Sequence, residues 1–125
     1  MAIAALAALL AIASAAAGRK THTYQVLISI SVDRSAHLIS GKVTSEPEAP
    51  SFFCEMASLR IREEMPGKDK VVARVYPNEE RLAEWKFTVG PSLHGARLYA
   101  ETSAYHLPSR PIECLAGRSR TVTAP

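Results

Sequence analysis

The sequence lacks the short patterns by which many enzymes and metal sites are recognised. It contains no glycine-rich phosphate loop and no G-x-S-x-G nucleophile turn. Its only aspartates, Asp33 and Asp69, lie far apart, so there is no D-x-D-x-D-G calcium loop. No two cysteine or histidine residues have the two-to-four-residue spacing that is typical of zinc ligands. The sequence therefore predicts no metal site and no cofactor.

Side chains that could act in catalysis are present but poorly placed. The four histidines stand in no recognisable spacing with either cysteine, so a thiolate–imidazole pair is not predicted. Neighbouring acids on a strand or turn point in different directions, which disfavours a general acid–base pair. Three pairs of acids occur, among Pro, Arg and Lys residues as in solvated loops: Glu46 and Glu48, Glu63 and Glu64, and Glu79 and Glu80. We predict no catalytic residue and no enzyme activity.

Charged side chains are absent from Met1 to Gly18. This run of Ala, Ile and Leu ends in small residues, and both Ala13–Ala15 and Ala15–Ala17 fit the small-x-small preference of signal peptidase. We predict a helical signal peptide over residues 1–18, cleaved near residues 15–18, as the chain's only and transient contact with the membrane. An uncleaved N-terminal anchor is the alternative. Removing 18 of 125 residues leaves 107, which is one ordinary domain over residues 19–125.

The net charge of +3 belongs entirely to the part of the chain after this leader. A nucleic-acid module would gather its Lys and Arg on one face and add aromatic side chains for stacking. Here the basic residues are scattered along the chain. The charge pattern therefore disfavours nucleic acid as a partner.

Beyond the leader, apolar and polar residues alternate with the period of two that is typical of half-buried strands. The clearest segment is residues 24–33, in which Leu27 alone breaks the alternation. Gly41, inside the second segment, indicates a bulge or a close backbone approach. The predicted strands are residues 24–33, 38–45, 57–63, 70–76, 83–89, 97–105 and 119–123. Seven strands at this spacing predict an all-β fold, an antiparallel Greek-key β-sandwich of immunoglobulin-like or transthyretin-like order.

Two details of the fifth segment leave alternatives open. A helix over residues 78–87 suits the composition, but Pro77 and the alternation from Ala83 to Val89 favour a strand. Trp85 and Phe87 share the apolar face of that strand, which favours a place in the core over an exposed carbohydrate platform.

Several segments occur here in an order that resembles a known group of domains: "YQVLISISVD", "ISGKVTS", a Cys before a strand, "PGKDKVVARV", "EWKFTV", "ARLYAETS", then a Cys and "AGRSRTV". The chain resembles small secreted bacterial domains, common in actinomycetes, with an immunoglobulin-like or transthyretin-like sandwich. The resemblance covers about Tyr24 to Val122. It implies an accessory, wall-facing or adhesive module, and it names no ligand.

The two cysteines are predicted to meet at one end of the sandwich. In an antiparallel order alternate loops lie at the same end, so the loops at residues 46–54, 77–81 and 106–118 share it. Cys54 and Cys114 belong to two of these loops. In an exported protein two otherwise unpartnered cysteines most simply form a disulfide, so we predict a Cys54–Cys114 bridge.

The same end is the predicted binding surface, because loops on a rigid scaffold commonly carry binding residues. The candidate binding residues are Phe52, Phe53, His106, Arg110 and Arg118. The alternative for Phe52 and Phe53 is that they cap the core beneath the disulfide. We expect a non-catalytic module that binds an unidentified protein or glycan, or serves a structural role, at the cell surface, at the cell wall or in the medium. A second hypothesis is a secreted inhibitor or a small-ligand or carbohydrate-binding protein that uses these loops.

Overall fold

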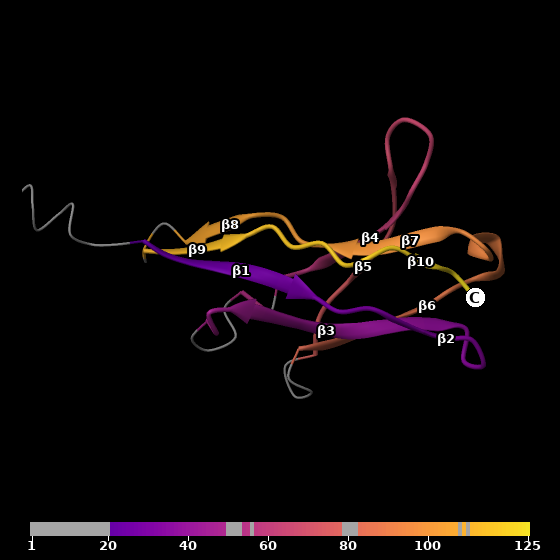
Figure 1. The fold of residues 1–125 in the computed structure, drawn as a ribbon, viewed down its shortest axis with the longest axis horizontal. Coiled ribbons are helices and arrows are strands. Elements are labelled where there is room, and N and C mark those ends of the chain that lie inside the picture. Colours follow the sequence, from indigo (N-terminus) through magenta and orange to yellow (C-terminus); the bar gives the residue numbers. More distant parts are fainter. Residues whose placement is uncertain (1–20, 50–53, 56, 79–82, 108, 110) are drawn as a thin grey trace, which may run out of the picture.

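The computed structural model describes residues 21–49, 54–55, 57–78, 83–107, 109 and 111–125. These residues form ten strands and one short 3-10 helix, with no α-helix among them (Figure 1). No helix in this part of the chain is long and apolar enough to cross a membrane. The predicted signal peptide lies outside it. The elements are β1 (His22–Ile28), β2 (Ser31–Asp33), β3 (Leu38–Glu46), β4 (Leu59–Glu63), β5 (Lys70–Val75), β6 (Glu84–Thr88), η3 (Pro91–Leu93), β7 (Arg97–Glu101), β8 (Tyr105–Leu107), β9 (Ile112–Leu115) and β10 (Val122–Thr123).

The strands form two sheets that face each other (Figure 1). One sheet has the order β2-β3-β1-β9-β8, in which β1 and β2 pair with the same edge of β3 and β6 pairs with its opposite edge. The second sheet has the order β10-β7-β4-β5. All pairs are antiparallel except β1 with β9. The expected all-β, two-sheet architecture is confirmed.

The expectation of seven strands was wrong, first because the strand predicted at residues 24–33 is interrupted. β1 and β2 pair with β3 in one unbroken register, from Ile28 opposite Val43 to Ser31 opposite Ser40. At the break, the backbone N–H of Lys42 donates to the Ser29 hydroxyl at 2.9 Å instead of to a backbone carbonyl. The side chain of Ser29 therefore replaces one backbone hydrogen bond and divides the strand without adding a residue.

The second cause is that most of the expected loop at residues 106–118 is strand. Tyr105 of β8 pairs with Cys114 of β9, and a single bridge joins Glu101 to Arg118. Between these pairs, the Thr102 hydroxyl accepts the Gly117 N–H at 2.9 Å. Residues 97–107 and 111–123 thus form one long hairpin in two segments, and hydroxyl groups fill the gap that short-range alternation cannot reveal.

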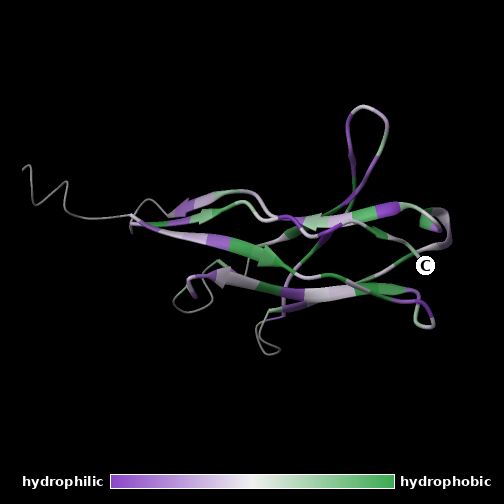
Figure 2. Cartoon of the chain, viewed as in Figure 1, coloured by the Kyte–Doolittle hydropathy of each residue, from purple (hydrophilic) through white to green (hydrophobic). Residues whose placement is uncertain are grey.

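β9 joins the two sheets because it pairs with β1 while its hairpin continues into β10 of the other sheet. The core lies between the sheets, and hydrophobic residues are concentrated along the strands (Figure 2). Leu27, which broke the predicted alternation, points outward and is 44% exposed. The most deeply buried large side chains are Ile39, Leu59, Ile61, Leu98, Val26, Val43 and Cys54.

Candidate functional site

The predicted disulfide between Cys54 and Cys114 is confirmed, with a Cα–Cα distance of 5.6 Å. Cys54 lies in the connection between β3 and β4, and both cysteines are buried. Cys114 does not lie in a loop as predicted, since it belongs to β9. The bridge therefore fastens a loop directly to the strand that joins the two sheets.

The residues predicted to bind at this end are only partly described. Phe52, Phe53 and Arg110 lie outside the described residues. His106 is exposed on β8, directly opposite Glu113 of β9. Arg118 lies farther along the hairpin, opposite Glu101 of β7, and its side chain covers an aromatic ring on the second sheet. His106 and Arg118 thus occupy different parts of the long hairpin.

A buried glutamate lies next to the bridge and was not predicted from the sequence. Glu55 is 4% exposed, and its Oε1 accepts a hydrogen bond from the Ser45 hydroxyl. Ser45 Oγ in turn accepts the backbone N–H of Ala49 at 2.8 Å. The other carboxyl oxygen of Glu55 is buried without a hydrogen-bond partner. This arrangement ties the connection after β3 to the end of that strand.

The outer face of the second sheet carries a network of ion pairs. Arg60 and Arg62 of β4 both reach Glu101 Oε1, at 3.0 and 2.9 Å. Glu64 accepts from Arg97 Nε at 3.0 Å and from the Thr121 hydroxyl at 2.8 Å. These contacts pair the charges of this face with one another, although Arg62 Nε is buried without a hydrogen-bond partner.

Tyr99 is the aromatic centre of this face. Its side chain points away from the core, yet the residue is only 2% exposed because the Arg118 guanidinium lies 3.8 Å from the ring centroid. The Tyr99 hydroxyl donates to Asp69 Oδ2 at 2.5 Å, and Arg62 Nη2 donates to the Asp69 carbonyl at 2.9 Å. Arg118 therefore has a structural partner within the sheet.

These contacts shift the pKa of three carboxyl groups. The Tyr99 hydroxyl and the Met65 N–H lower the pKa of Asp69, and the Thr121 hydroxyl and Arg97 lower that of Glu64. Burial alone would raise the pKa of Glu101, but the hydrogen bonds from Arg62 and Arg60 together outweigh it and lower this pKa as well. All three groups are thus stabilised as carboxylates in the folded protein.

We expect stability to fall in acid because of these three groups. A carboxyl with a depressed folded-state pKa contributes its full stability above the unfolded-state value, here 4.5 for glutamate and 3.8 for aspartate. That stability is lost as pH falls through the folded-state pKa. Urea unfolding between pH 6 and pH 3 should show midpoints that are flat above about pH 5 and fall below about pH 4.

The variant Glu101→Gln is the matched control for this pH dependence. It should be less stable at pH 6 and should lose less on acidification, because one of the three groups no longer titrates. If the wild type and Glu101→Gln had parallel pH profiles, Glu101 would contribute nothing to the acid sensitivity.

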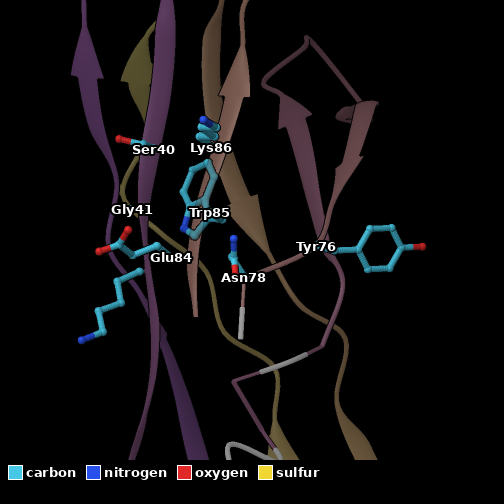
Figure 3. A pocket seen from close by; sticks show the side chains of 8 residues that line it. Ser40, Gly41, Tyr76, Asn78, Glu84, Trp85 and Lys86 are labelled. Atoms are coloured by element: carbon cyan, nitrogen blue, oxygen red, sulfur yellow. The ribbon is translucent and has the colours of Figure 1, made fainter. Parts of the chain in front are cut away.

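A cleft of about 700 Å³ opens where β6 begins beside β3. We call it the β3–β6 cleft, and Figure 3 shows the side chains that line it. Its described lining comes from β3, from β6 and from the connection between β5 and β6. These residues are Ser40, Gly41, Lys42, Tyr76, Asn78, Glu84, Trp85 and Lys86. This site was not predicted from the sequence, because the alternation of β3 and β6 assigned its residues only to a core face and a solvated face.

The polar residues of the cleft are set by the pairing of β3 with β6. Lys42 lies opposite Glu84, and Ser40 lies opposite Lys86, so these four side chains share the outer face of the pair. Among the described residues, the ion pairs of the protein involve none of these charged groups. The described lining of the cleft thus presents two ammonium groups and one carboxylate that are not engaged with each other.

Trp85 lies opposite Gly41 and points to the inner face of the sheet, where it is 3% exposed. The predicted core position of Trp85 is therefore confirmed. Its Nε1 is buried without a hydrogen-bond partner. In Figure 3 the Asn78 side chain points toward the indole, while the Tyr76 ring points away from it. Tyr76 is 72% exposed. The cleft therefore has an indole at its base and an exposed aromatic ring at its rim.

In the described part of the chain, no cluster of three or more His, Cys, Asp or Glu residues is positioned to hold a metal ion. No protein-family model matches the chain, and comparison with curated proteins and with solved structures also finds no match.

Proposed function

We propose that this protein is a non-catalytic binding module that works outside the cell and holds its ligand in the β3–β6 cleft. The observation that carries the proposal is the cleft itself, because about 700 Å³ lies within the range of ligand sites in proteins. The lining combines a few polar side chains with two aromatic ones, and it is built on paired strands. Strands position side chains more firmly than loops do.

Export is supported by two independent features. The leader at residues 1–18 has the composition of a signal peptide, and the Cys54–Cys114 disulfide is the kind of bond that persists in oxidising compartments. The resemblance to wall-facing domains of actinomycetes agrees with a bacterial protein at the cell surface or in the medium. These features together favour action outside the cytoplasm.

The strand order supports an immunoglobulin-like sandwich over a transthyretin-like one. Counting β1 with β2 as strand A, the pairs β1–β3–β6 and β4–β7–β10 reproduce the A-B-E and C-F-G groupings of immunoglobulin domains. In this count β5 is strand D. It pairs with β4, which is strand C, and not with β6, which is strand E, and this departs from the constant-domain order. Sandwiches of this type serve many unrelated functions, so the proposal depends on the cleft and not on the fold.

The chemistry of the cleft favours binding over catalysis. Among its described lining residues Glu84 is the only carboxylate, and none is a histidine or a cysteine. General acid–base catalysis with carboxylates needs two groups whose environments separate their pKa values. The lining offers donors and acceptors to a ligand without such a pair.

A thermal-shift screen tests the proposed function. The mature, oxidised protein is heated with a library of small metabolites and oligosaccharides. A ligand at ten times its Kd should contribute about 1.4 kcal/mol and raise Tm by about 5 °C or more. The shift should be lost in Tyr76→Ala and Lys86→Gln, whose side chains are exposed at the cleft.

The control variant for this screen is Lys70→Gln, an exposed lysine on β5 that does not line the cleft. It should keep the full shift. A shift that survives both cleft substitutions would place the site elsewhere, for example at the end that carries His106. A library without any stabilising compound would contradict the proposed function.

A further inference from the structure

We infer that the ligand of the β3–β6 cleft is an anionic saccharide. This inference rests on the proposed function and adds the chemical class of the ligand. Three properties of the cleft carry it: its net charge, its alternating donors and acceptors, and the exposed ring at its rim.

The charge of the cleft favours an anion. Among the described lining residues, the two ammonium groups of Lys42 and Lys86 stand against the one carboxylate of Glu84. Elsewhere on the protein the acids Glu64 and Glu101 are already held by arginines. The lysines of the cleft remain available to a ligand, and a ligand with a carboxylate or sulfate group would complement them.

The remaining polar groups of the cleft suit hydroxyl groups. A saccharide hydroxyl both donates and accepts hydrogen bonds. Ser40 Oγ can do both, while Glu84 accepts and the lysines donate. A simple anion such as sulfate would have no hydrogen to donate to the acceptor oxygens of Glu84 and would be repelled by its charge. The mixture therefore favours a polyhydroxylated anion.

The aromatic rim adds a surface for the apolar face of a sugar ring. Tyr76 is 72% exposed, the largest exposure among the large hydrophobic side chains that the structure describes. Its ring is directed away from Trp85 and from the other labelled side chains of the cleft (Figure 3), so a saccharide would reach it by extending past the rim. Tyrosine combines a flat apolar body with a polar hydroxyl and loses little conformational freedom on binding.

The single tryptophan of the chain makes the inference directly measurable. Trp85 lines the cleft, and since the sequence contains one tryptophan, all tryptophan fluorescence arises at this site. The oxidised protein is titrated with oligogalacturonate as a uronic saccharide, chondroitin sulfate as a sulfated one, cello-oligosaccharide as a neutral one, and citrate as a carboxylate without a sugar ring. We expect saturable changes with one or both anionic saccharides, weakened about tenfold in 0.5 M NaCl by screening.

Paired substitutions separate charge from shape. Lys86→Gln should weaken oligogalacturonate binding about tenfold, while Lys86→Arg should stay within about threefold of the wild type. Glu84→Gln should strengthen binding of the anionic probes, because it removes the repulsive charge and keeps a carbonyl acceptor. Lys70→Gln, on β5, should leave binding unchanged.

Each other outcome overturns the inference in a distinct way. Binding of the neutral oligosaccharide alone would show that the charge of the cleft is not used. Equal binding of citrate would show that the sugar ring is not recognised. No response to any probe, together with a stabilising compound of another class in the thermal-shift screen, would reject the saccharide and leave the proposed binding function intact. A screen without any stabilising compound would reject both.

Discussion

Removal of the Cys54–Cys114 bridge is expected to lower the free energy of unfolding by about 4 kcal/mol, since its 60-residue separation closes a long loop in the unfolded chain. This is a large share of the roughly 5–15 kcal/mol that stabilises a typical domain. Both cysteines are buried, so the double variant Cys54→Ala, Cys114→Ala keeps apolar side chains in place. Urea unfolding of the wild type and the double variant measures the difference.

Reduction provides a second route to the same quantity. The wild type unfolded in the presence of a thiol reductant should match the double variant, whereas the reductant should leave the double variant unchanged. Mass spectrometry of the oxidised wild type should find the Cys54–Cys114 peptide and no alkylated thiol. A loss below about 1 kcal/mol would mean that the unfolded chain is already compact around residues 54–114.

Substitution Gly41→Ala is expected to be strongly destabilising, costing about 3 kcal/mol or preventing folding. A Cβ at this position would lie 1.8 Å from the Ser29 carbonyl oxygen and 2.9 Å from Trp85 Nε1. The nearer atom belongs to the backbone, so no rotation of a flexible side chain can relieve the overlap. The strand would have to move at the break between β1 and β2. Urea unfolding, together with the yield of soluble protein, measures the effect.

Gly90→Ala is the matched control for this substitution. Gly90 has φ −73°, a conformation that any residue adopts, and no atom lies within 4 Å of the added Cβ. Its effect should stay within about 0.5 kcal/mol, as for ordinary surface changes. Equal effects of the two substitutions would refute the argument that the close approach of Ser29 requires glycine at position 41.

Much of the strand content follows from the sequence because one face of each strand is buried. Ile39 and Val43 alternate with polar neighbours and lie in the core, as their spacing predicts. Gly41 was predicted to mark a bulge or a close backbone approach, and it meets the Ser29 carbonyl. The cysteine pairing followed from loop order and export, and the bridge forms. Each of these features depends on short-range pattern or on topology, both of which the sequence carries.

Other features depend on partners that are distant in sequence and polar. The hydroxyls of Thr102 and Ser119 complete the hairpin from β7 to β10, although serine and threonine normally indicate turns or surface. Tyr99 is buried on the outer face because Asp69 and Arg118 come from other elements. The β3–β6 cleft arises where residues 40–42 meet residues 84–86. No local pattern distinguishes such residues from a solvated sheet face.

The parallel pairing of β1 with β9 also determines how the protein would respond to mechanical load. The described chain enters through β1 at one end of the sandwich and leaves after β10 at the other (Figure 1). A force applied between these ends acts along the strands, so it loads the β1–β9 hydrogen bonds in shear, all at once, and does not unzip them singly. Once these bonds fail, the Cys54–Cys114 bridge prevents the 60-residue segment between the cysteines from extending. A domain tethered at both ends would therefore yield less chain under tension than the same domain without the bridge.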